Sequence, residues 1–355
     1  MIYLDYQATT PLAPEAREAM LRWLAGDGFA NPHSAHAMGR AAKAAVEVAR
    51  EQVAALFPSG GQVVFTGSAT EAINLAIRGG PNGPVAVSAI EHAAVRDTAR
   101  WFDADHELAV DADGLIDPEV PFPEGARLVA AMQVNNEIGT IQPVERLAER
   151  ARAAGAWFLC DAVQGAGKLA APAGADLIAV SAHKLHGPKG IGALWVRDGL
   201  QLSPIILGGG QEGGLRSGTL SPALCAGFGA AAKLALGRRE EDAAHVEMLW
   251  NEARGVLDRW VLNGSGTKRY KGNLNLRLNG LDVARLMSDC RRIMFSAGSA
   301  CASGSGRPSH VLRALGLSDG EARSSIRLGF GRYTTRDELI EACRTIDAAA
   351  KAQGV

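Results

Sequence analysis

The sequence lacks the features that mark nucleic-acid-binding, membrane and secreted proteins. Its 37 basic and 38 acidic residues nearly cancel to a net charge of -1, which gives no sign of a basic footprint for nucleic acid or of a polybasic membrane patch. No apolar run approaches the length of a membrane span. The chain opens on strand-like alternation over residues 1–6, without a charged start and an apolar signal core. We therefore expect a cytoplasmic protein that acts on small molecules.

Cysteine is scarce as well. The five cysteines form no CxxC pair and no even disulfide framework, so we expect reduced thiols and no resident metal. Four of them lie in apolar or helical settings and are predicted to be core thiols: Cys160, Cys225, Cys290 and Cys343. The fifth, Cys301, stands in GSACASGSG (298–306), where glycine and serine give backbone freedom and little burial. This thiol is predicted to be accessible and reactive.

Apolar runs and helical patterns alternate along the rest of the chain. With 355 residues and 47% hydrophobic content, the chain can bury one large core and a smaller second one. Short apolar runs predict buried strands at 63–65, 85–87, 128–131, 157–159, 177–180 and 191–196. Helical spacing is found at 40–56 and 144–154, and becomes longer from 223 onward, before polar strands and a final helix at 336–352. The alternation predicts an α/β fold whose mainly parallel sheet is covered on both faces, with a second lobe after it.

Polar side chains follow these apolar runs. Because an open parallel sheet binds ligands at the carboxyl ends of its strands, we expect these side chains to meet. Thr70 stands in TGSATE, where small residues at a helix start offer N–H groups to an anion, although the same pattern is commonly only a helix cap. Asp161 follows another run, and Ser181, His183 and Lys184 follow a third. These residue types suit pyridoxal phosphate, which needs a lysine, a carboxylate for its pyridine nitrogen and donors for its phosphate.

The order of the motifs resembles that of the cysteine desulfurases of the NifS/IscS type, from Tyr3 to about Leu339. The motifs are YLDYQATTP, GSATEA, EHAAV, VNNEIG, DAVQ, SAHKLHGPKGIG, RSGTL, GSAC and SIR. The resemblance implies a fold type I pyridoxal phosphate-dependent transferase. Its large domain, 13–239, would hold a mainly parallel seven-stranded sheet, and residues 1–12 and 240–355 would form a smaller α+β domain that carries the cysteine loop.

The resemblance also implies a role for individual residues. Lys184 would form the Schiff base with the cofactor, Asp161 would pair with the pyridine nitrogen and His92 would act catalytically and stack on the ring. Arg327 would clamp the substrate carboxylate bidentately, a geometry that lysine could not reproduce. The remaining cofactor contacts would come from Asn136 and Gln164 at the ring oxygen, with Asn136 also facing the substrate, from Ala69, Thr70, Ser181 and His183 at the phosphate, and from Thr219 of a second subunit in a homodimer.

The implied activity is the removal of sulfur from L-cysteine, which gives L-alanine and a persulfide on Cys301. The sulfur would pass to an acceptor protein such as an iron–sulfur scaffold, with Cys301 as a transient ligand of the cluster. Two alternatives stay open: a selenocysteine lyase or other pyridoxal phosphate lyase, and a non-catalytic sulfur-carrier or iron–sulfur subunit. Lys189 competes with Lys184 for the cofactor, and Arg216 and Arg332 compete with Arg327 for the substrate.

Overall fold

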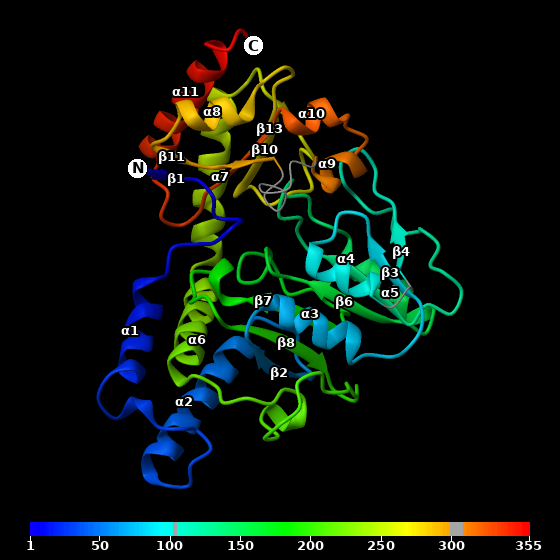
Figure 1. Ribbon diagram of the computed structural model, residues 1–355, viewed down its shortest axis with the longest axis vertical. Coiled ribbons are helices and arrows are strands. Elements are labelled where there is room, and N and C mark those ends of the chain that lie inside the picture. Colours follow the sequence, from blue (N-terminus) through cyan, green and yellow to red (C-terminus); the bar gives the residue numbers. More distant parts are fainter. Residues whose placement is uncertain (102–104, 299–307) are drawn as a thin grey trace.

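The computed structural model describes residues 1–101, 105–298 and 308–355, and a seven-stranded sheet is its largest element (Figure 1). The strands are Gly61–Thr66 (β2), Val85–Ser88 (β3), Asp105–Leu108 (β4), Leu128–Met132 (β5), Trp157–Asp161 (β6), Leu177–Ser181 (β7) and Gly192–Arg197 (β8). Their order is β2-β8-β7-β6-β5-β3-β4. Neighbouring strands from β7 to β4 pair parallel, whereas β8 is antiparallel to both β7 and β2. The prediction of a mainly parallel seven-stranded sheet is confirmed.

Helices cover both faces of this sheet. They are Pro14–Leu24 (α1), Ala37–Ala54 (α2), Ala69–Arg78 (α3), Ala93–Arg100 (α4), Val144–Ala153 (α5) and Pro222–Gly237 (α6). Alternation along β6 explains the two layers: Phe158 and Cys160 pack with α2, α5 and α6, whereas Leu159 between them packs with α3 and α4. The buried strands are therefore apolar on both sides, as the unbroken apolar runs indicate.

A second core lies beside the sheet, in the upper part of the view in Figure 1. A four-stranded sheet, β12-β13-β10-β9, and a short parallel pair, β1 with β11, build it together with three helices, α7, α8 and α11, whereas α9 and α10 pack in a smaller cluster with Ile90 and Ile138. The elements are Ile2–Tyr3 (β1), Arg239–Val256 (α7), Val261–Leu262 (β9), Asn273–Arg277 (β10), Val283–Asp289 (α8), Ile293–Met294 (β11), Ser296–Ala297 (β12), His310–Ala314 (α9), Asp319–Arg323 (α10), Ser325–Gly329 (β13) and Arg336–Lys351 (α11). Ile2 and Leu4 pack into this core with Trp260 and Leu328, so the start of the chain joins its second half. The domain boundaries at 13–239 and 240–355 stay a prediction.

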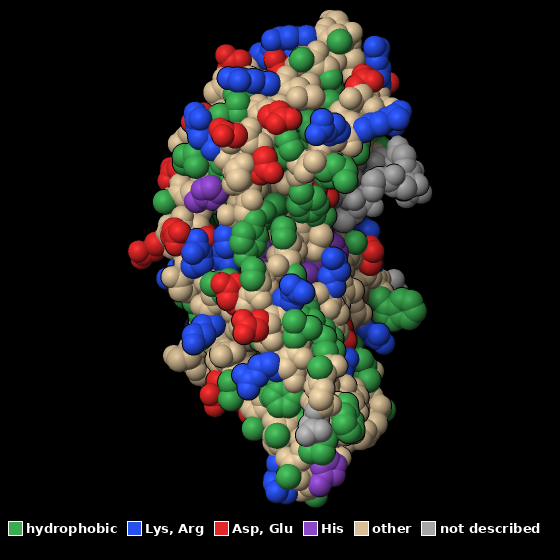
Figure 2. Space-filling view, turned by 90° about the vertical axis from the view of Figure 1, so that its left-hand side faces the viewer, with side chains coloured by type: hydrophobic (Ala, Val, Ile, Leu, Met, Phe, Trp, Pro, Cys, Tyr) green, Lys and Arg blue, Asp and Glu red, His purple; other side chains and the backbone are tan. Residues whose placement is uncertain are grey.

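The edge strand β4 and three short turns of 3₁₀ helix had no clear signal in the sequence. β4 reads DHEL and lies at the edge of the sheet beside β3, so it lacks the apolar run that marks the central strands. The turns of 3₁₀ helix are Gly26–Phe29 (η1), Ala182–Lys184 (η2) and Glu212–Gly214 (η3). Within the described ranges, no helix combines the length and apolarity that crossing a bilayer requires. Figure 2 shows acidic and basic side chains interspersed on the visible face.

Candidate active site

A cavity of about 330 Å³ opens at the carboxyl ends of β5, β6 and β7, where an open parallel sheet binds its ligands. The residues that line it are Gln7, Ala8, Ser68, Ala69, Thr70, Ile73, His92, Ala94, Met132, Val134, Asn136, Asp161, Val163, Gln164, Ser181, His183, Lys184 and Arg327. The structure thus gathers the predicted cofactor and substrate residues around one space, apart from Thr219 and Cys301. Their individual roles stay predictions.

One end of the cavity is formed by the start of α3. Ser68 caps this helix, because its Oγ accepts a hydrogen bond from the Glu71 N–H at 3.3 Å. Glu71 in turn accepts from the Gly67 N–H at 2.7 Å, which fixes the turn between β2 and α3. The N–H groups of Ala69 and Thr70 therefore belong to the first turn of a helix, an arrangement that favours an anion.

Ser181 and His183 approach the cavity from the end of β7. Ser181 is buried as the last residue of that strand. His183 lies in η2, with its Nδ1 3.1 Å from Thr9 Oγ1. Burial, together with the positive charges of Lys184 and Lys189, lowers the pKa of His183 to about 4. His183 is therefore neutral near pH 7 and offers a hydrogen bond, not a charge, to an anion.

Lys184 ends η2, and two backbone carbonyls hold its amino group. Its Nζ donates to the Ala8 carbonyl at 2.9 Å and also to the Gln7 carbonyl. Gln7 and Ala8 were missed as site residues in the sequence. Their motif was noticed, but nothing in a linear chain shows that its carbonyls fold against a lysine 176 residues further on. The competing Lys189 is exposed in a turn and does not line the cavity.

Asp161 is a buried carboxyl group at the end of β6, only 6% exposed. Its Oδ1 accepts from the Val163 N–H at 2.9 Å. Burial raises the pKa of Asp161, while nearby His92 and Lys184 act in the opposite direction. His92 caps α4, and its Nδ1 accepts from the Ala94 N–H at 3.1 Å, so the neutral ring carries its proton on Nε2. A buried carboxylate of this kind gains from a cationic ligand atom.

The side chain of Gln164, which contacts Gln7, presents an oxygen to the cavity that accepts no hydrogen bond from any described residue. Gln164 Nε2 donates to the Gln7 carbonyl at 3.0 Å. Its Oε1 is buried and has no hydrogen-bond partner within the described residues. Because an unpaired buried oxygen is costly, this atom is well placed to accept from a ligand.

Arg327 reaches the cavity from β13 of the smaller sheet and is fully buried. Its guanidinium donates to Asp5 Oδ1 at 2.7 Å and to the Asn136 carbonyl at 3.1 Å. Its Nε is buried and lacks a partner among the residues the structure describes. One edge of Arg327 is thus held by Asp5, a pairing that the sequence did not suggest. The competing Arg216 and Arg332 pair with Glu71 and Asp242 and do not line the cavity.

Among the described residues, Thr219 is the predicted site residue that does not line the cavity. Thr219 is exposed after η3. Cys301 lies outside the described residues. The described chain on either side of residues 299–307 is anchored to residues that are close in sequence to Arg327 and Asn136, which line the cavity. The Gly298 N–H donates to the Ser325 carbonyl at 2.7 Å, and Ser309 Oγ donates to Glu137 Oε2.

The other four cysteines are buried, as predicted. Burial raises the pKa of Cys225 and of Cys343 to about 12, and it raises the pKa of Cys160 and of Cys290 as well. A thiol with a raised pKa and no access to solvent is a poor nucleophile. These four cysteines are therefore suited to packing.

Glu137 allows a test of the anchor at Ser309, whose Oγ donates to this carboxyl group. Burial raises the pKa of this carboxyl group to about 7, although the Ser309 hydrogen bond and the charge of Arg327 lower it. In the unfolded chain the pKa is about 4.3. The folded pKa is thus the higher one, so the stability that Glu137 contributes is complete below pH 4.3 and is lost as the pH rises through 7.

We expect Glu137→Gln to remove this pH dependence, which is at most about 1.4 kcal/mol per pH unit for one proton. Between pH 5 and pH 8, the urea midpoint of the variant should fall less than that of the parent protein. Urea unfolding curves of both proteins at the two pH values make the comparison. Equal falls would show that Glu137 is ionised throughout.

The fold and the cavity define the class of protein first: a fold type I enzyme, with its site at the strand ends of a seven-stranded sheet. The comparisons then give the family. The class-V aminotransferase family model matches residues 2–341. The chain belongs to this family.

Two relatives and two solved structures illustrate the similarity. The cysteine desulfurases IscS of Rickettsia bellii and Rickettsia akari are each 40% identical to this chain. The alignment with the Rickettsia bellii protein covers 97% of this chain and 90% of that relative. The alignment with the Rickettsia akari protein covers 99% of this chain and 92% of that relative. A NifS-like protein aligns with a TM-score of 0.90 at 30% identity over 99% of both chains. SspA, solved in complex with cysteine, aligns with a TM-score of 0.82 at 36% identity over 94% of this chain and 100% of its own. The resemblance that the motif order indicated is confirmed.

Proposed function

We propose that this protein is a cysteine desulfurase, which takes sulfur from L-cysteine, releases L-alanine and carries the sulfur as a persulfide on Cys301. The observation that carries the proposal is the meeting of Lys184, Asp161 and Arg327 in one cavity, although they come from two sheets. The similarity to proteins named cysteine desulfurase, and to a structure solved with cysteine, supports the same reading.

The cavity suits pyridoxal phosphate. Lys184 supplies the amine, and the buried Asp161 supplies a carboxylate for the pyridine nitrogen. The unpaired Gln164 Oε1 can accept from the ring hydroxyl group. The start of α3, with Ser181 and His183, provides donors for the phosphate. When bound, this cofactor supplies an aldehyde that links covalently to amines and a ring that takes up electron density.

Each side chain of the cavity would then have its own role in the reaction. Arg327 would orient the substrate by its carboxylate, with the Nε that has no partner among the described residues available for the contact. Lys184 Nζ would take the proton from the substrate α carbon. Asp161 would keep a proton on the pyridine nitrogen, which a neutral amide at this position could not do. His92 would cover one face of the ring.

Cys301 would carry out the sulfur transfer itself. Its thiolate would attack the sulfur of L-cysteine, so that a sulfur–sulfur bond forms as the carbon–sulfur bond breaks. The electron pair of the broken bond stays with the substrate carbon, which also gains a proton. L-cysteine and the Cys301 thiol thus give L-alanine and the Cys301 persulfide, with every atom accounted for.

Partners follow from the same proposal. We infer a homodimer in which the exposed Thr219 of one protomer completes the phosphate site of the other. The persulfide would pass to a sulfur-acceptor protein, such as an iron–sulfur scaffold.

The activity is tested with the purified protein, pyridoxal phosphate, L-cysteine and a thiol reductant. L-alanine and sulfide should form in equal amounts. A protein that binds the cofactor but forms neither product would not be a desulfurase. Comparing alanine release from L-cysteine and from L-selenocysteine by Cys301→Ala separates the selenocysteine lyase, because a lyase would keep its activity without this thiol.

Arg327→Lys should raise the KM for L-cysteine about ten- to a hundredfold, since losing a bidentate charge-assisted contact costs roughly 1.5–3 kcal/mol. The visible spectrum of the bound cofactor should not change, because Arg327 is proposed to face the substrate. Steady-state kinetics give the KM. Arg332→Lys is the matched control, since Asp242 holds that guanidinium outside the cavity. A change below twofold at Arg327 would remove it from the substrate site.

A further inference from the structure

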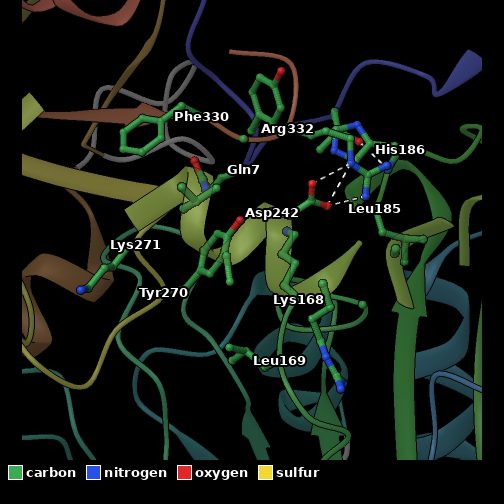
Figure 3. Close-up of a pocket in the computed structure, with 18 of the residues that line it drawn as sticks. Gln7, Lys168, Leu169, Leu185, His186, Asp242, Tyr270, Lys271, Phe330 and Arg332 are labelled. Atoms are coloured by element: carbon green, nitrogen blue, oxygen red, sulfur yellow. Dashed lines mark hydrogen bonds and ion pairs between the residues drawn. The ribbon is translucent and has the colours of Figure 1, made fainter. Parts of the chain in front are cut away.

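A second cavity of about 190 Å³ lies next to the candidate active site, between the two cores (Figure 3). Its walls come from the chain before α1, the segment between β6 and β7, helices α6 and α7, and the chain after β13. Among the described residues, Gln7 alone lines both cavities. Its carbonyl accepts from Gln164 on one side, and its side-chain Nε2 donates to the Gly272 carbonyl at 2.9 Å on the other. The second cavity is therefore a separate space with its own lining.

Two of the cations that line this cavity already have carboxylate partners. Asp242 accepts from Arg332 Nε at 2.9 Å and from another guanidinium nitrogen at 2.6 Å, as Figure 3 shows. Glu247 pairs with Lys271 at the rim. Asp242 and Glu247 are thus neutralised by these partners.

Lys168 and Arg269 are different. In the part of the chain that the structure describes, neither forms an ion pair with a carboxylate. Lys168 Nζ lies 5.1 Å from the centre of the Tyr270 ring, and Arg269 donates to backbone carbonyls only. Burial, together with the charge of Lys184, lowers the pKa of Lys168 to about 7. The cavity has an excess of positive charge, which an anion would balance.

The remaining lining is mixed: it includes Thr10, His186 and the exposed Arg239, and it also contains an apolar wall. Leu169, Leu185, Ala235, Val246 and Phe330 contribute side chains to it. At about 190 Å³ the space is smaller than the roughly 300 Å³ at which ordinary small-molecule sites begin. A fitting ligand is small, carries a single negative charge and has an apolar body.

We propose that this cavity binds small monocarboxylates. The carboxylate group would lie at Lys168, and the apolar part of the ligand would pack against Val246 of α7 and Phe330. The proposal does not depend on the reaction at the neighbouring site. Lys168 would supply a charge-assisted hydrogen bond, and desolvation inside the cavity would strengthen it. Phosphates fit less well, because their several charges would have to be buried beside an apolar wall, against Lys168 and an Arg269 whose terminal N–H groups already donate to backbone carbonyls.

Benzoate is a suitable probe, since it has no amine with which to enter the desulfurase reaction. Calorimetric titration of the holoenzyme at pH 6.5 should show binding of benzoate and much weaker binding of benzamide, its neutral analogue. Lys168→Met should weaken benzoate binding about tenfold or more, which corresponds to the loss of one charged hydrogen bond. Lys168→Arg, which keeps the charge, should restore most of it.

Lys271→Met is the matched control, because Lys271 lines the same cavity but its ammonium group pairs with Glu247. It should bind benzoate as the parent protein does. Arg327→Lys distinguishes the two cavities and should also leave benzoate binding unchanged. Circular dichroism and the cofactor spectrum verify that each variant is folded. Undiminished binding in Lys168→Met, loss of binding in Arg327→Lys, or no benzoate binding by the parent protein would overturn the proposal.

Discussion

Lys184→Ala should abolish the visible absorbance of lysine-bound pyridoxal phosphate and reduce turnover by roughly 10²–10⁴-fold, the usual contribution of a positioned acid–base group. The protein should stay folded, because Lys184 supplies its amine to a cavity and is held there by two backbone carbonyls. Absorbance after addition of the cofactor, with circular dichroism as the check on folding, gives the answer.

Lys189→Ala is the matched control, five residues further on and exposed in a turn. Its spectrum should equal that of the parent protein. If Lys184→Ala kept the visible band while Lys189→Ala lost it, the cofactor lysine would be Lys189. If both variants kept the band, the half-buried Lys168 would be the next candidate.

The residues at the strand ends were predictable from the sequence. Each predicted strand in the centre of the sheet is buried on both faces, so its apolar run shows where it ends, and the polar residues that follow are easily found. Asp161 and Ser181 are the last residues of β6 and β7, and Lys184 follows in η2. Parallel pairing then brings these ends to one edge of the sheet.

The contacts between the chain start and the site were not predictable in the same way. Gln7 and Ala8 act through backbone carbonyls, which every residue possesses, so their side chains give no signal. Asp5 pairs with Arg327, 322 residues away, and only the packing of β13 beside the chain start creates that pair. The second cavity is a further case, because Lys168 looks like a surface lysine until α7 and Tyr270 are placed around it.

The last prediction concerns the thiol that the sequence singled out. Cys301→Ser should still bind L-cysteine, seen as a shift of the visible absorbance, because Lys184, Asp161 and Arg327 remain in the cavity. It should form neither L-alanine nor persulfide, since a hydroxyl group near pH 7 is a far weaker nucleophile than a thiolate.

Mass spectrometry of the parent protein after brief exposure to L-cysteine locates the transferred sulfur. The mass increase of one sulfur atom should lie on the Cys301 peptide. The other four cysteines are an internal control, because burial raises the pKa of each and keeps it from reacting. A persulfide on one of these four, or L-alanine formed by Cys301→Ser at the parent rate, would show that sulfur leaves by another route. The expectation for Cys301 rests on the described chain that flanks its segment: Gly298 donates to Ser325, two residues before Arg327, and Ser309 donates to Glu137, the neighbour of Asn136 in the sequence.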